Sequence, residues 1–203
     1  MSPLIFKVAT EPEEFEQIHR LNYQTFVQEI PQHHANIEGR LVDKFHEENT
    51  YIICLDGNLL VGMVCARDNR PFSLDLKLEN LDSYLPPHQS LCELRLLAIA
   101  KPHRNPKVFR GLMAKLAEYC ESKGYDLGIM SGSTRQLKLY RHLGFEPFGP
   151  LVGAEEARFQ PMYLTFTAYE HLKSESRMLE TLLKKLPKNR FILYNRESSQ
   201  SKL

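Results

Sequence analysis

The sequence predicts one α/β domain in which a mixed, mostly antiparallel sheet is flanked by helices, followed by a C-terminal helical appendage. Three observations support this fold class. Short β-rich runs alternate with amphipathic stretches of helical period. Asp56-Gly57-Asn58 joins two such runs as a hairpin, which is typical of antiparallel pairing. The length of 203 residues and the hydrophobic content of 42% suit a single buried core.

Each element is predicted from its local pattern. Thr10, followed three residues later by Glu13, matches a capping box and is expected to start the first helix. A turn is expected at 131–133, and Gly124 and Gly144 are expected to end the helices before them. In chain order we predict a strand at Leu4–Ala9, a helix at about Glu11–Glu29, strands at Tyr51–Leu55, Leu59–Arg67 and Leu91–Ala100, a helix at about Pro106–Lys123, a strand at Tyr125–Met130, a short helix ending near Leu143, and strands at Phe145–Phe148 and Pro161–Thr167.

We place a domain boundary between residues 1–168 and an appendage at 169–203. The appendage is expected to be an amphipathic helix ended by Pro187, then a polar tail that is disordered over its last nine residues. Packing on the domain is the default for its apolar face, and homodimerisation or contact with a lost neighbouring domain are alternatives. The final Ser201-Lys202-Leu203 matches a peroxisomal address, but a chance ending is the simpler interpretation.

The charge balance, the apolar runs and the cysteines argue against several classes of protein. A net charge of +1 predicts no whole-chain attraction to nucleic acid or to an acidic membrane. The apolar runs are far shorter than the roughly 20 residues that cross a bilayer, and no secretory signal is present. The four cysteines lack the paired spacing of a zinc site, so we expect no metal and a reducing cytoplasm. Dinucleotide-binding, Walker and zinc-protease motifs are absent from the sequence.

A cluster of positive charge follows the strand at 91–100. Between Lys101 and Ala117 the chain carries five cations and no acidic residue. A helix N-terminus at the end of a strand offers backbone N–H groups to an anion, so this loop is a candidate phosphate site. A solvated basic face is an equally good interpretation of the charges alone. The five cations are Lys101, Arg104, Lys107, Arg110 and Lys115.

With the later run Tyr140-Arg141-His142-Leu143-Gly144-Phe145, this segment resembles the GNAT acyltransferase superfamily over roughly residues 4–167. The resemblance implies an acyl-CoA N-acyltransferase fold with acyl-CoA, commonly acetyl-CoA, as co-substrate. Arg104 matches the first position of the superfamily's pyrophosphate loop, whereas Asn105, Lys107 and Phe109 stand where glycine is common. The implied cofactor contacts are Leu97, Ala98, Ile99, Arg104, Asn105, Lys107, Val108, Phe109, Arg110 and Gly111.

The N-terminal half is similar to the acyl-homoserine lactone (autoinducer) synthases and the long-chain N-acyl amino acid synthases. Those enzymes often take the acyl group from acyl carrier protein, and the glycine-poor loop fits them better than a typical acetyl-CoA enzyme. The chain has no Trp, unlike the autoinducer synthases, so a homoserine lactone product is not supported. The similarity implies substrate-binding roles for Arg20, Phe26, Asp43, Arg67 and Arg95.

The implied reaction is aminolysis of a thioester, which needs a base, an oxyanion site and an acid. Glu93 is the candidate base, and its alternative is a structural ion pair with Arg95 or Arg67. In the superfamily a tyrosine at the position of Tyr140 often protonates the departing thiolate. The alternative role for Tyr140 is aromatic packing against the cofactor or the core. Free N–H groups along 96–98 could stabilise the oxyanion.

Three hypotheses follow. The first is an N-acyltransferase that uses acyl-CoA and a small-molecule amine. The second is an N-acyl amino acid synthase that depends on acyl carrier protein, whose acidic surface would meet the basic patch at 101–115. The third is a catalytically silent GNAT-fold binding or regulatory module.

Overall fold

The computed structural model describes residues 3–30, 32–154 and 157–185, and its centre is a mixed sheet of eight strands. The strand order is β1-β2-β3-β4-β5-β8-β6, and β7 pairs with β8. The strands are β1 (Leu4–Val8), β2 (Thr50–Asp56), β3 (Leu59–Arg67), β4 (Leu91–Ile99), β5 (Leu127–Ser133), β6 (Glu146–Pro147), β7 (Val152–Ala154) and β8 (Ala157–Thr165). The α-helices are α1 (Pro12–Tyr23), α2 (Pro106–Lys123), α3 (Leu137–His142) and α4 (Phe166–Lys185).

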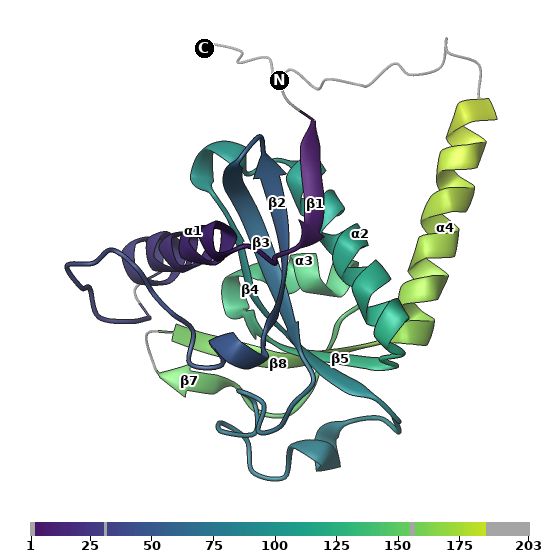
Figure 1. Ribbon diagram of the computed structural model, residues 1–203. Coiled ribbons are helices and arrows are strands. Elements are labelled where there is room, and N and C mark those ends of the chain that lie inside the picture. Colours follow the sequence, from purple (N-terminus) through teal and green to yellow (C-terminus); the bar gives the residue numbers. More distant parts are fainter. Residues whose placement is uncertain (1–2, 31, 155–156, 186–203) are drawn as a thin grey trace, which may run out of the picture.

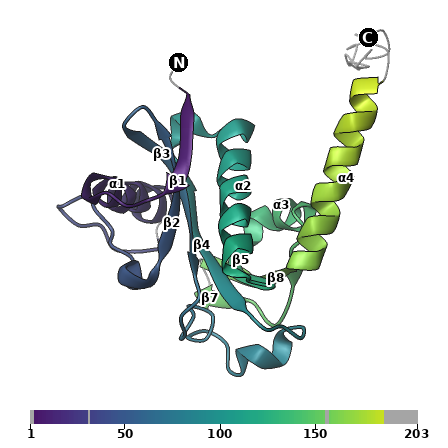
Figure 2. The ribbon, with the colours of Figure 1, turned by 45° about the vertical axis from the view of Figure 1, so that its right-hand side comes forward.

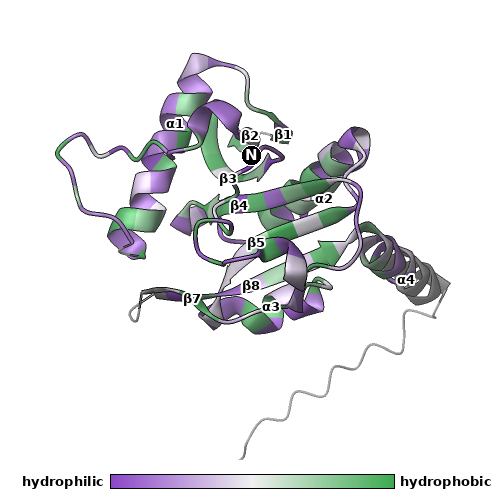
Figure 3. Ribbon diagram, turned by 90° about the horizontal axis from the view of Figure 1, so that it is seen from below, coloured by the Kyte–Doolittle hydropathy of each residue, from purple (hydrophilic) through white to green (hydrophobic). Residues whose placement is uncertain are grey.

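Helices cover both faces of the sheet, as Figures 1 and 2 show. Helix α1 covers one face of the sheet, and its Ile18 and Leu21 pack with Met63 and Cys65 of β3. The opposite face is covered by α2, whose Val108, Leu112 and Leu116 pack with other residues of β2 and β3. The strands between these helices are coloured largely as hydrophobic in Figure 3. The predicted mixed, mostly antiparallel sheet is therefore confirmed, with β4 and β5 as its parallel pair.

The first helix differs from the prediction at both ends. It starts after Glu11 rather than Thr10, because Pro12 occupies its first position and the capping box lies one residue further on. The Glu14 carboxylate accepts the backbone N–H groups of Glu11 at 3.2 Å and Thr10 at 2.9 Å. After Tyr23 the α-helix passes into a π-helix at Gln24–Glu29, a change that hydrophobic spacing did not indicate.

Two further differences concern the second half of the sheet. The turn predicted at 131–133 is wrong, because these residues extend β5 and pair with β8 as far as Ser133 opposite Phe159. The strand β7 was missed, since three residues are too short to show a period. The helix α4 begins at Phe166, just before the predicted boundary. The predicted Pro187 stop and the polar tail lie outside the described residues.

The pairing of β4 with β5 covers only the start of both strands. Leu91–Glu93 face Leu127–Ile129, and the two strands are not paired beyond these residues. On the other edge of β4, Cys65 faces Arg95 and Met63 faces Ala98, so residues 96 and 97 stand opposite Val64 alone. This two-for-one arrangement is a β-bulge, and Leu96 has a φ of +54°. The centre of the sheet is thus interrupted on both sides of β4.

Candidate active site

Glu93 lies on the face of the sheet that α1 covers, and it is the last residue of β4 that pairs with β5. Its side chain is fully buried. One carboxylate oxygen accepts the Ser73 hydroxyl at 2.5 Å and the Leu74 N–H at 3.1 Å. The other accepts the Ser73 N–H at 2.8 Å and lies 3.4 Å from Nε of Arg95. A carboxylate has about four acceptor sites, so these four donors occupy it fully.

The geometry at Glu93 therefore favours the structural alternative over the base. It supports the predicted ion pair with Arg95, two residues along the same strand, and adds Ser73 and Leu74, which the sequence did not indicate. The Glu93 carboxylate anchors the loop at 69–75 to the strand that carries the bulge. Ser73 had no sequence signal, because its hydroxyl reaches Glu93 only through tertiary packing.

Arg95 and Asp43, both predicted to bind substrate, form a paired contact. The two guanidinium Nη atoms donate to the two oxygens of Asp43 at 2.8 and 3.0 Å. Asn49 donates to the same carboxylate at 2.9 Å, and so does the Phe45 N–H at 3.0 Å. Burial would raise the pKa of Asp43, but the hydrogen bonds and charge of Arg95 hold it below its ordinary value. Asp43 is thus a fixed anion.

The second predicted arginine of this region, Arg67, is almost fully buried and pairs with Glu48 and the Pro71 carbonyl. The ring of Phe45 lies beneath both guanidinium groups, 3.8 Å from Cζ of Arg67 and 4.8 Å from Cζ of Arg95. This stacking ties the loop at 40–49 to β3 and β4. Phe45 was not predicted, because an isolated aromatic in a loop gives no periodic signal.

Arg20 and Phe26 do not join this cluster. Arg20 is two-thirds exposed and pairs with Glu16 on the same turn of α1. Phe26, in the π-helix, packs with the apolar core beneath α1. The predicted substrate contact of Arg20 is therefore not supported by its position, because the helix directs residue 20 away from the sheet.

Tyr140 lies on the other face of the sheet, against the end of β5 that pairs with β8 but not with β4. A methyl group in place of the Gly132 hydrogen would be 2.9 Å from Cδ2 of Tyr140, so only glycine admits the ring here. Burial raises the pKa of the Tyr140 phenol, and a hydrogen bond from the Ser133 backbone opposes part of that rise. The phenol is consequently protonated at neutral pH, as a proton donor must be.

The predicted phosphate site at the start of α2 is occupied by the helix's own cap. The Asn105 side chain accepts the N–H groups of Lys107 at 3.0 Å and Val108 at 3.1 Å. The Asn105 carbonyl accepts the Phe109 N–H at 3.3 Å, and Pro106 has no N–H. A pyrophosphate would have to displace Asn105 to reach these groups.

The predicted cofactor contacts at the start of α2 fall into two groups, those that face the sheet and those that face solvent. Val108 is buried in the core, and Gly111 allows the Phe6 ring to pack on the helix, since a methyl group there would lie 2.1 Å from Phe6 Cζ. These two positions do not line a ligand site, because both face the sheet. Arg104 pairs with Glu29 at 2.5 Å. Lys107 and Arg110 are exposed and, within the described ranges, have no carboxylate partner.

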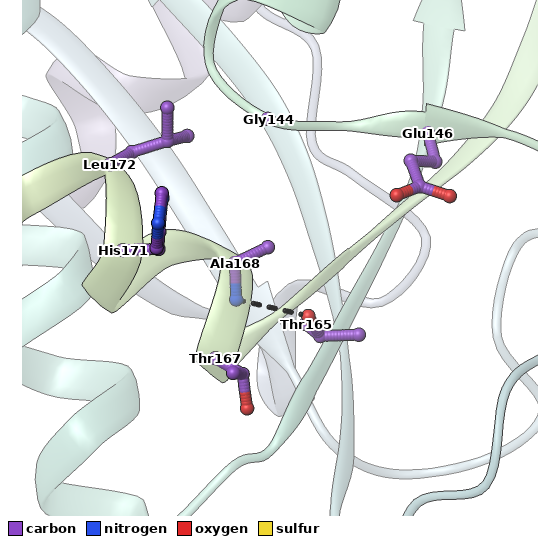
Figure 4. Close-up of a pocket in the computed structure, with 7 residues that line it drawn as sticks. All are labelled: Gly144, Glu146, Thr165, Thr167, Ala168, His171 and Leu172. Carbon is purple, nitrogen blue, oxygen red and sulfur yellow. Dashed lines mark hydrogen bonds between the residues drawn. The ribbon is translucent and has the colours of Figure 1, made fainter.

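Two hollows lie near α4. One is open and lies beside the start of the helix, where Thr165 accepts the Ala168 N–H at 3.2 Å (Figure 4). It contains none of the predicted site residues. The other is apolar and lies between α2, α4 and the paired ends of β4 and β5, with Leu94 and Gly128 in its wall. In the described part of the chain no helix is both long and apolar enough to span a membrane.

Comparisons with known proteins agree with this geometry. BjaI, a CoA-dependent acyl-homoserine lactone synthase solved with SAM and isopentyl-CoA, matches with a TM-score of 0.72 and 20% identity, over 85% of this chain and 89% of that chain. FeeM, an N-acyl amino acid synthase from uncultured soil microbes, matches with a TM-score of 0.62 and 15% identity, over 89% and 99%. A putative N-acetyltransferase from Lactobacillus plantarum matches with a TM-score of 0.59 and 14% identity, over 81% and 99%. No curated protein sequence matches.

The fold is that of the GNAT-type acyltransferases, as the sequence predicted. The model of the family "N-acyl amino acid synthase FeeM" matches residues 17–166, and the chain belongs to this family. The third hypothesis, a silent binding module, thereby loses its support.

Proposed function

We propose that the protein transfers an acyl group from a pantetheine thioester to the amino group of an amino acid. The observation that carries the proposal is the position of two groups on opposite sides of one interruption in the sheet. Tyr140 lies on the α2 face and the Arg95–Asp43 pair on the α1 face, and the Leu96 bulge lies between them. Donor and acceptor would approach from opposite faces and meet at the bulge.

The chemistry follows from these positions. The amine nitrogen attacks the thioester carbon, and the carbonyl oxygen becomes an oxyanion. A β-bulge leaves one residue unpaired, so a backbone N–H at Leu96 or Leu97 is suited to stabilise that charge. The C–S bond then breaks as the carbonyl re-forms, and the nitrogen loses one proton to solvent. Tyr140 gives its proton to the departing thiolate and regains one from solvent. Glu93 is proposed as a positioning residue, which holds Arg95 and the loop at 69–75.

The apolar hollow beside Leu94 and Gly128 supports an acyl group longer than acetyl. It lies along the paired part of β4 and β5, reaches Leu94 just past the last residue of β4 that pairs with β5, and is on the same face as Tyr140. Burial of each added methylene contributes about 0.8 kcal/mol to binding, so a fitting chain would gain affinity with length.

Acyl carrier protein is the donor that the α2 N-terminus favours. The cap by Asn105 leaves no free N–H group for the pyrophosphate of CoA, whereas the exposed Lys101, Lys107 and Arg110 suit the acidic surface of a carrier. Acyl-CoA remains the second candidate, because the similar BjaI structure holds a CoA ester. The cytoplasm suits both donors and four reduced cysteines.

The test measures thiol release from acyl-CoA and from acyl carrier protein, each with acetyl and long-chain acyl groups, against a panel of amino acids. We expect release that depends on the amino acid and is fastest with long-chain acyl carrier protein. Lys107→Glu should raise KM for the carrier about tenfold and leave acyl-CoA unaffected. Lys123→Glu, a charge reversal at the far end of α2, is the matched control. Absence of thiol release with every donor would refute the proposal.

A further inference from the structure

Two neighbouring polar side chains on the α1 face are buried without hydrogen-bond partners among the described residues. Asn22 is fully buried, and both its amide nitrogen and its amide oxygen are unpaired. The Thr25 hydroxyl, in a side chain only 5% exposed, is also unpaired. Burying such groups without partners is costly, and native proteins do so rarely. These groups therefore have hydrogen-bonding capacity that a bound molecule could use.

The helix changes its geometry where these two residues lie. Asn22 is in the last turn of α1, and Thr25 is in the π-helix that follows. π-Helical turns are rare and often mark functional sites. Residues three apart share a face of a helix, so the amide and the hydroxyl can act on one ligand atom.

The same helix face is directed at the β4 bulge. Ile18 and Phe26, one turn before and one turn after Asn22, pack in the cluster that contains Leu96 and Ala98. The unpaired groups thus lie on the acceptor side of the point where the thioester carbon would sit.

A third unpaired group belongs to the sheet itself. Ser131 of β5 has a buried Oγ without a partner among the described residues, and it lies beyond Ile129, the last residue paired with β4. Ile129 faces Glu93 across the strands, and period-2 alternation puts Ser131 on the same face. Unpaired polar groups therefore occur on both the helix and the strand that border the interruption.

We propose that Asn22 and Thr25 bind the amino group of the acceptor. A neutral primary amine has two N–H donors and one lone pair. The Asn22 and Thr25 oxygens can accept the two N–H groups and leave the lone pair directed at the thioester carbon. The inference deepens the proposed function and rests on it.

The neutrality of these groups is chemically suited to that task. A carboxylate beside the amine would stabilise the unreactive ammonium form, since an opposite charge favours the charged state. Asp43 and Glu93 are each contacted by four donors, and Glu48 pairs with Arg67, so these three carboxylates are engaged by the protein's own groups. An amide and a hydroxyl bind the free amine without favouring its protonation. In the reaction the nitrogen forms the C–N bond and then loses one proton to solvent, as the C–S bond breaks.

The test uses Asn22→Leu and Thr25→Val, which keep approximate shape and remove the polar groups. Kinetics are measured with the amino acid that gives the highest kcat/KM for the wild type, together with thiol release by water alone and thermal unfolding. We expect KM for the amino acid to rise about tenfold or more. Release by water reports whether the thioester site is intact, and Tm should hold or rise by about 2–4 °C, because an unpaired buried group has been removed.

The control is Gln24→Leu, an exposed neighbour on the same helix. A fall in Tm with unchanged KM would show that Asn22 serves a structural water, and would overturn the inference. If the wild type itself shows no thiol release that depends on an amino acid, the proposed function fails first. If the wild type is active and the variants match it, only the amine site is refuted.

Discussion

The ring of Tyr140 packs directly on Gly132, so closely that a methyl group on residue 132 would lie 2.9 Å from Cδ2 and 3.0 Å from Cε2 of the tyrosine. The glycine thereby sets the distance between α3 and β5. It also sets the position of the phenol at the end of β5 that is not paired with β4, where we propose that the thiolate departs.

Gly132→Ala should therefore lower kcat about tenfold or more while the protein stays folded, because the phenol shifts from its place in the transition state. Steady-state kinetics with the preferred donor measure this effect. Gly128→Ala, where the added methyl would lie 3.4 Å from Leu94 in the wall of the apolar hollow, is the comparison. It should change KM for a long-chain donor and leave kcat with an acetyl donor little changed. Equal effects of the two substitutions would contradict the assigned role of Gly132.

Tyr140→Phe should lower kcat by about 10²-fold, the usual contribution of a proton donor. Because burial raises the pKa of Tyr140 above its ordinary value of 10.0, the wild-type phenol stays protonated through neutral pH. Activity that depends on its proton is lost only as the pH rises through that higher value. A kcat–pH profile should thus show an alkaline decline in the wild type that the variant lacks, and a decline shared by both would exclude Tyr140 as the acid.

Asp43→Asn should cost about 3 kcal/mol of unfolding free energy at pH 7, because the buried Arg95 then loses its two-point anion and keeps only the longer contact with Glu93. The pKa of Asp43 is held below its ordinary value of 3.8, so its stabilising contribution is present above that pH. The contribution is lost as the pH falls through the lower value in the folded protein. Urea unfolding at pH 7 and pH 3 should show the difference between the two proteins shrinking at the acid pH.

Gly111→Ala should destabilise the protein by about 2 kcal/mol, because the added methyl overlaps the Phe6 ring of β1. Phe6→Ala should relieve the overlap, so the double variant should lose less stability than the two single losses added together. Thermal and urea unfolding of the wild type, the two single variants and the double variant give the four stabilities of this double-mutant cycle. Strictly additive losses would show that the helix and β1 do not contact each other here.

The local patterns of this sequence determined most of the elements and the fold class. Hairpin chemistry at 56–58 and apolar periodicity placed β2, β3 and α2, because their signals are confined to neighbouring residues. The family motifs pointed to Asp43, Arg67 and Arg95, which the fold brings together around Phe45, and to Tyr140, which lies on the opposite face of the sheet. Their roles in binding and catalysis stay predictions. The π-helix, the bulge at Leu96 and the strand β7 had no such signal, since each arises from pairing or packing with distant residues.

Tertiary structure alone decided what the polar groups do. The charged pattern of residues 91–111 was compatible with a base at Glu93 and an anion site at Asn105. In the folded chain Ser73, Leu74 and Arg95 fill the carboxylate, and the Asn105 amide caps its own helix. Asn22 and Thr25 showed no motif at all, yet they are buried groups without partners among the described residues. Residue types set which hydrogen bonds are possible, but only the fold determines which donors and acceptors meet and which stay unpaired.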